Sequence, residues 1–89
     1  MEQETGYELA RHLLAIAVRQ MLAQCARRDE MFAAALSGKE GAKGGAYTTL
    51  GWEYNNRALL LHSMIGDMLA ALPASERPEV PDFPLLPRF

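Results

Sequence analysis

The sequence predicts an all-α fold: an antiparallel hairpin of two long helices with an extended proline-rich C-terminal tail, which forms a helical bundle by self-association. Apolar residues recur at alternating steps of four and three in two segments, a glycine-rich stretch separates them, and prolines recur every third residue near the C-terminus. The expected hairpin covers residues 1–72, with helices at 5–37 and 48–72 and a loop at 38–47. The tail, residues 73–89, is expected to dock on the hairpin or on a partner.

The first helix has a start signal, an apolar stripe and a stop signal. Thr5 and Glu8 have the spacing of a capping box, in which each side chain bonds the backbone of the other residue. The stripe follows at helical spacing and consists of Leu14, Val18, Met21, Cys25, Phe32 and Ala35. Gly38 can end the helix because glycine adopts the left-handed conformation at little steric cost. Arg28 interrupts the stripe, which predicts either a drift of the helix or a pairing with a carboxylate across the interface.

The second helix carries a more regular apolar stripe. Residues 38–46 contain four glycines in nine positions and therefore favour a turn before this helix. Thr48 or Thr49 can cap its start. The stripe recurs at steps of four and three and consists of Tyr54, Ala58, Leu61, Ile65, Met68 and Leu72. Pro73 ends the helix because its ring disfavours helical geometry at the preceding residue.

Both predicted helices carry more apolar residues than one shared interface can bury. The first has a second apolar row, formed by Leu9, Leu13, Ile16 and Ala17. The second has a further row, formed by Trp52, Leu59, Leu60, Met64 and Leu69. A chain this short buries only about 60% of the surface that its unfolded form exposes, so two hairpins sharing a four-helix core would cover these rows economically. We therefore expect a homo-oligomer, with a dimer favoured.

The C-terminal tail has the three-residue period of a polyproline II helix. Its periodic prolines are Pro78, Pro81, Pro84 and Pro87. One edge of such a strip carries Val80, Phe83, Leu86 and Phe89. Leaving an apolar edge in water costs about 25 cal/mol per Å², so the tail predicts a groove on this protein, on a dimer mate or on another protein.

These features predict a small non-enzymatic protein-binding module that serves as an accessory subunit, adaptor or inhibitor of another protein. A protein partner is expected to contact the apolar tail, its neighbouring arginine and two aromatic residues of the second helix, because buried aromatic residues usually dominate interface energetics. The candidate residues are Val80, Phe83, Leu86, Arg88, Phe89, Trp52 and Tyr54. A purely structural assembly subunit is an alternative that the sequence does not separate from a binder.

A second alternative is a small-ligand binder that holds an anionic, nucleotide-like molecule at the glycine-rich loop and the start of the second helix. The candidate residues would supply positive charge, aromatic faces and hydrogen-bonding groups. They are Lys39, Lys43, Tyr47, Thr48, Trp52, Asn55, Asn56 and Arg57. The loop differs from a phosphate-binding P-loop, since it follows a helix and no Gly-Lys pair precedes a Ser or Thr.

Charge, cysteine count and histidine spacing argue against several other classes. A formal net charge of −2 and a pI near 5.6 do not favour nucleic acid as the main partner. The single cysteine and the lack of a secretion signal predict a cytoplasmic protein, and the longest apolar runs are too short for the roughly 20 residues of a membrane span. With two histidines and one cysteine, we expect no catalytic site, no metal site and no cofactor.

Overall fold

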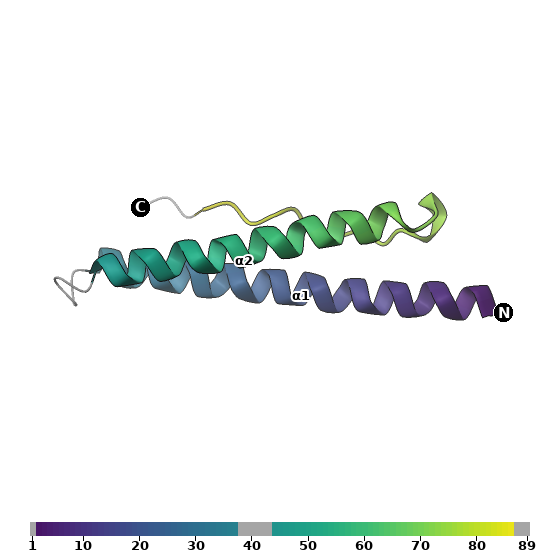
Figure 1. Ribbon diagram of the computed structural model, residues 1–89, viewed down its shortest axis with the longest axis horizontal. Coiled ribbons are helices and arrows are strands. Elements are labelled where there is room, and N and C mark those ends of the chain that lie inside the picture. Colours follow the sequence, from purple (N-terminus) through teal and green to yellow (C-terminus); the bar gives the residue numbers. More distant parts are fainter. Residues whose placement is uncertain (1, 38–43, 87–89) are drawn as a thin grey trace.

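The computed structural model describes residues 2–37 and 44–86, and these form two long α-helices and one short 3-10 helix (Figure 1). Helix α1 spans Glu2–Leu36, helix α2 spans Gly44–Ala70, and the 3-10 helix η2 spans Ala74–Glu76. No β-strand occurs within the described residues. The prediction of an all-α fold with two long helices is therefore confirmed.

The two helices lie side by side and run in opposite directions (Figure 1). After η2 the chain reverses, and residues 77–86 run back along the helices without forming a helix or strand (Figure 1). Three segments of the chain therefore lie alongside one another, and the last of them can cover only one side of the helix pair.

Both helices begin earlier than the sequence signals predicted. Helix α1 starts at Glu2 and not at residue 5, which agrees with the good helix propensity of Glu and Gln and with the favourable position of acidic residues near a helix N-terminus. Helix α2 starts at Gly44, so residues 44–47 of the expected loop are helical and the predicted threonine cap is wrong. The Thr49 hydroxyl instead donates to the carbonyl of Gly45 one turn back, at 3.0 Å.

The end of α2 also differs by two residues from the predicted end at residue 72. The helix stops at Ala70. The amide of Leu72 bonds the carbonyl of Leu69 at 3.1 Å, which is the tighter turn that often closes a helix. Pro73 then prevents the helix from continuing, as predicted from the restriction that proline places on the residue before it.

The core is built mainly from the predicted stripes of the two helices, together with Ala17, which the sequence analysis placed in the second apolar row of the first helix. Its buried residues come from α1, from α2 and from the turn that follows α2: Leu14, Ala17, Met21, Cys25, Ala58, Ile65 and Leu72. Partly buried Val18, Leu61 and Met68 from the same stripes pack against this cluster. Val80 and Phe83 also pack against it, so the chain after η2 contributes to the core that the helices share.

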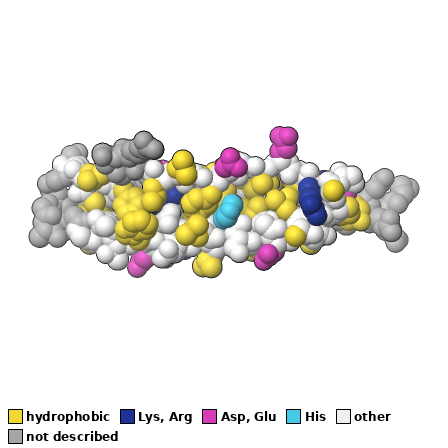
Figure 2. All heavy atoms as spheres, turned by 90° about the horizontal axis from the view of Figure 1, so that it is seen from above, with side chains coloured by type: hydrophobic (Ala, Val, Ile, Leu, Met, Phe, Trp, Pro, Cys, Tyr) yellow, Lys and Arg dark blue, Asp and Glu magenta, His cyan; other side chains and the backbone are white. Residues whose placement is uncertain are grey.

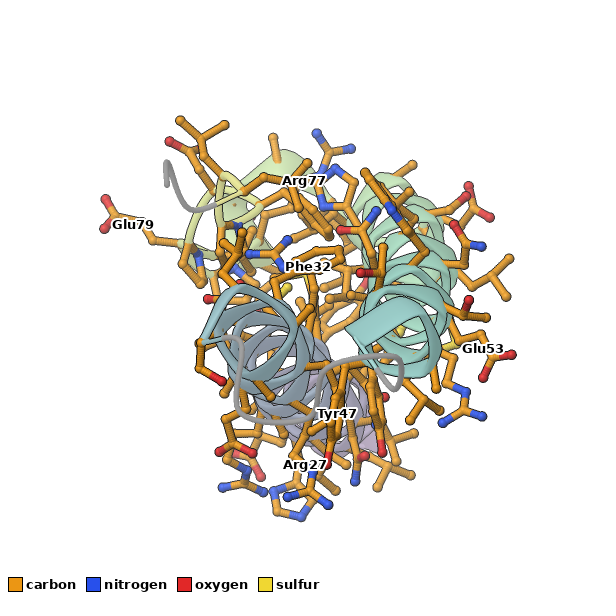
Figure 3. All side chains as sticks on the ribbon, turned by 90° about the vertical axis from the view of Figure 1, so that its left-hand side faces the viewer. Arg27, Phe32, Tyr47, Glu53, Arg77 and Glu79 are labelled. Carbon is orange, nitrogen blue, oxygen red and sulfur yellow. The ribbon has the colours of Figure 1, made fainter. Side chains whose placement is uncertain are left out.

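Gly51 allows a close approach between the two helices near the loop end of the hairpin. It is buried against the ring of Phe32, which points between the helices (Figure 3). A Cβ added at Gly51 would lie less than 3.0 Å from three atoms of this ring. The ring is itself held edge-on against Trp52, with centroids 5.2 Å apart. Glycine at position 51 therefore allows the Phe32 ring to pack directly against the backbone of α2.

We expect Gly51→Ala to destabilise the fold by about 1 kcal/mol, because overpacking costs about 1–3 kcal/mol and alanine regains only about 1 kcal/mol of helix propensity. Gly66 provides a matched control in the same helix, since a Cβ added there meets nothing within 4 Å. Gly66→Ala should stabilise the fold by about 0.5–1 kcal/mol. Urea unfolding of both variants measures the difference, and a similar effect at the two positions would contradict the close packing at Gly51.

Candidate functional site

Arg28, the charged residue in the apolar stripe of α1, is 0% exposed. Its guanidinium donates to Asp29 Oδ1 through Nε at 2.8 Å and to Asn55 Oδ1 through Nη1 at 3.0 Å. The carboxylate that pairs with Arg28 therefore belongs to the next residue of the same helix, and the group across the interface is the amide of Asn55. Asn55 is itself only 7% exposed, so this polar contact lies inside the helix pair.

Arg28 also holds the segment that follows η2. Its Nη1 donates to the main-chain oxygen of Pro84 at 3.1 Å and its Nη2 donates to that of Leu85 at 3.0 Å. The ring of Phe83 lies over the guanidinium, 5.8 Å from Cζ, and meets the ring of His62 edge-on at 5.4 Å. A planar guanidinium has five donors in a fixed fork, which suits several acceptors at once. One buried side chain therefore joins α1, α2 and the returning chain; we call this set of contacts the tail site.

The predicted tail anchors have different environments in the structure. Val80 and Phe83 are half-buried against the core of the same chain. Leu86 is 44% exposed, and its neighbour Leu85, which was not singled out in the sequence, is 88% exposed. Arg88 and Phe89 lie outside the described residues. The inner tail residues thus face the protein itself, while the outer two leucines face solvent.

Trp52 and Tyr54, the predicted contact residues of the second helix, lie on opposite flanks of α2, as residues two positions apart in a helix must. Trp52 is 47% exposed and packs on Phe32. Tyr54 is half-buried, and its ring is flanked by the guanidinium groups of Arg27 at 6.0 Å and Arg57 at 5.2 Å. The two aromatic residues therefore belong to two different surfaces.

The residues predicted to bind a small anion do not converge in the described part of the chain. Asn55 is buried and its side-chain oxygen accepts a hydrogen bond from Arg28, whereas Asn56 is exposed. Arg57 is exposed and lies on the tyrosine side of the helix, away from Trp52. The other members of the predicted set are half-buried Tyr47, exposed Thr48, and Lys39 and Lys43, which lie outside the described residues.

One exposed apolar surface combines α2 with the returning chain. Trp52 and Leu59 lie seven positions apart on the same flank of α2, and Asn55 lies between them, directly beside the tail site. The exposed members of this surface, which we call the tail-side patch, are Trp52 (47%), Leu59 (45%), Leu85 (88%) and Leu86 (44%). Figure 2 shows hydrophobic side chains along this side of the molecule, with acidic side chains toward its edges.

A second exposed apolar surface lies on the side without the tail. The contact between Arg27 and Tyr54 marks this side, and Figure 3 shows Arg27 on the opposite side of the helix pair from Arg77. Leu13 precedes Arg27 by 14 positions, or about four helical turns, so it shares this flank of α1. The exposed apolar residues of this surface, which we call the tail-free face, are Leu9 (60%), Leu13 (49%), Leu50 (39%) and Met64 (45%).

Gln24 carries a buried side-chain oxygen, Oε1, without a hydrogen-bond partner among the described residues. Leaving such a group unpaired costs about 1–3 kcal/mol. We therefore expect Gln24→Met, which keeps the length of the side chain, to stabilise the fold by about 1 kcal/mol in thermal unfolding. Gln20→Met, one turn earlier at an exposed position, is the matched control and should change stability by less than about 0.5 kcal/mol.

Cys25 behaves as a packing residue. It is 2% exposed, and burial raises the pKa of its thiol, while the charge of Arg28 opposes this shift and that of Asp29 adds to it. The thiol therefore stays neutral around neutral pH and is a poor nucleophile.

Within residues 2–37 and 44–86, neither long helix reaches the apolar length of a bilayer span, and no three His, Cys, Asp or Glu side chains gather as a metal site would require. No protein-family model, curated protein or solved structure matches this chain significantly. The two apolar surfaces and the tail site are therefore the features of the described residues that bear on function.

Proposed function

We propose that the protein is a small non-enzymatic protein-binding module that self-associates and presents an apolar surface to another protein. The exposure of large apolar side chains on both sides of the helix pair carries this proposal, from Leu13 and Met64 on one side to Trp52 and Leu85 on the other. Contiguous exposed apolar surface on a soluble protein usually marks an interaction site. Accessory subunit, adaptor and inhibitor are the roles that fit such a module.

Self-association is assigned to the tail-free face. Half-buried Tyr54, Leu61 and Met68, which follow one another at seven-residue spacing on α2, lie between the core and this face. Two hairpins that bring these flanks together would form a four-helix bundle, in which each hairpin supplies half of the shared core. A dimer is the smallest assembly that covers this face.

Binding of another protein is assigned to the tail-side patch. The tail is an extended, proline-rich strip, and Arg28 holds its carbonyl groups while Leu85 and Leu86 stay exposed. A surface that is already fixed before binding loses less conformational entropy when a partner arrives. Trp52 adds a large, half-exposed aromatic side chain on the same flank of α2 as Leu59, and such residues commonly dominate binding energy.

Two alternatives can be tested separately. A purely structural assembly subunit would use the tail-free face and would leave the tail-side patch without a partner. A binder of nucleotide-like anions would change the fluorescence of Trp52, the single tryptophan of the chain, when nucleotides are added. This second alternative has less support, because one of its predicted ligand-binding residues, Asn55, is buried and hydrogen-bonded to Arg28.

The experiment compares affinity capture by three full-length proteins: the native chain, the double variant Leu85→Ser/Leu86→Ser, and Leu60→Ser. Leu60 is 73% exposed but lies two positions from buried Ala58, on the outer side of α2, and serves as the matched control. Circular dichroism checks that all three are helical. We expect one partner to be retained by the native chain and Leu60→Ser and lost from the double variant; retention of the same proteins by all three would overturn the proposal.

A further inference from the structure

A pocket of about 270 Å³ lies between α1 and the first residues of the chain that follows η2. Its apolar lining comes from one face of the helix and from the chain opposite: Leu14, Ala15 and Val18, with Pro78 and Val80. Leu14 belongs to the core, and Val18 and Val80 pack against it, so the pocket is built on the core that the helices share. Small-molecule pockets usually enclose about 300–1,000 Å³, and a pocket of this size fits a ligand of modest size.

Two arginines of α1 also line the pocket. Arg11 and Arg19 are eight positions apart, which places them about 12 Å from each other along the helix, with Ala15 midway. The guanidinium of Arg11 is paired with the carboxylate of Glu76, so its charge is already balanced. Arg19 is exposed and forms no ion pair with any residue that the structure describes. The pocket therefore combines apolar walls with an unbalanced positive charge at its Arg19 end.

Glu79, the acidic residue of the lining, does not balance this charge. Figure 3 shows its side chain pointing away from the two helices, and it forms no ion pair within the described part of the chain. An incoming anion can therefore reach Arg19 without displacing a carboxylate of the protein. At the other end of the pocket, Glu76 already pairs with Arg11 and would repel a second carboxylate. The charged group of a bound anion is thus expected at Arg19, with the rest of the molecule extending toward Arg11.

We infer that this pocket binds a small amphiphilic carboxylate, with the carboxylate on Arg19 and the apolar part against Leu14, Val18 and Val80. The planar guanidinium of arginine can donate two parallel hydrogen bonds to a carboxylate. Burial of the apolar part removes apolar surface from water, which favours binding and which a purely ionic ligand could not supply. A neutral analogue would lose the ionic contact with the arginine. Medium-chain fatty acids are the simplest members of this ligand class.

The test titrates the full-length protein with octanoate by isothermal titration calorimetry, with octanol as the neutral analogue. Arg19→Gln removes the charge, and Arg27→Gln is the matched control, since Arg27 is also an exposed arginine of α1 but does not line the pocket. Ala15→Leu fills the pocket without changing its charge, and Ala23→Leu, about two turns later at an exposed position, is its control. All four positions are exposed, so the variants should fold, and circular dichroism checks that they are helical. Ala15→Met replaces Ala15→Leu if the latter is not helical.

We expect Arg19→Gln and Ala15→Leu each to weaken octanoate binding by about tenfold, and the two controls to change it by less than about twofold. Octanol should bind the native chain about tenfold more weakly than octanoate. Failure of octanoate to bind the native chain below its micelle-forming concentration overturns the inference. Equal weakening by Arg19→Gln and Arg27→Gln, or equal binding of octanol and octanoate, overturns the role of Arg19 and with it the inference. An effect of Arg19→Gln without one of Ala15→Leu would place the ligand on the helix surface outside the pocket and also contradicts it.

Discussion

Replacing Arg28 with alanine is expected to lower the free energy of unfolding by about 3 kcal/mol. The substitution leaves Asn55 Oδ1 and the carbonyls of Pro84 and Leu85 without their donor, and each unpaired buried group costs about 1–3 kcal/mol. Some of this cost is recovered when the tail leaves and its carbonyls meet water. Urea unfolding followed by circular dichroism measures the loss, and faster thiol labelling of Cys25 should accompany it.

Arg27 is the matched control, since it is the adjacent residue with the same charge. Its side chain is 58% exposed and pairs with Glu30 at 3.3 Å on the helix surface. Such exposed pairs contribute between nothing and about 1 kcal/mol, so Arg27→Ala should cost less than about 1 kcal/mol. Equal losses at the two positions would mean that Arg28 contributes charge or helix propensity alone and does not hold the tail.

Replacing Phe83 with alanine is expected to destabilise the protein by about 2 kcal/mol. Full burial of a phenylalanine makes such a change cost about 3–5 kcal/mol, and Phe83 is half-buried between the core, Arg28 and His62. Leu85→Ala, two positions later in the same tail, removes a side chain that is 88% exposed and should cost less than about 0.5 kcal/mol. Thermal unfolding of the two variants measures the difference, and a native-like Phe83→Ala would contradict docking of the tail in the structure.

The helix pair could be predicted from the sequence because apolar residues that recur at helical spacing lie on one face of a helix, and that face is buried when two helices pack. Leu14, Met21, Ala58 and Ile65 recur at the spacing of one helix face, and that face is the one that two packed helices bury. The exact ends could not be predicted, because capping residues compete with neighbours of good helix propensity. Thr49 illustrates this competition, since its hydroxyl bonds the preceding turn of the helix and does not begin it.

The tail site could be predicted only in part. The interruption of the apolar stripe by Arg28 was visible in the sequence, but its partners were not, because they include main-chain carbonyls from residues 56 and 57 positions away. Main-chain groups carry no sequence signal. The sequence alone could have placed Trp52 and Tyr54 on different surfaces of the second helix, since residues two positions apart in a helix point in different directions.

The molar mass of the full chain in solution, measured by light scattering over a range of concentrations, tests the central proposal most directly. The chain has a mass of 9.8 kDa. A self-associating module that buries its tail-free face should show at least twice this mass and return toward the single-chain mass on dilution or in the variant Leu13→Glu. A mass of 9.8 kDa at every concentration would contradict self-association and would leave the exposed apolar surfaces without the role proposed for them.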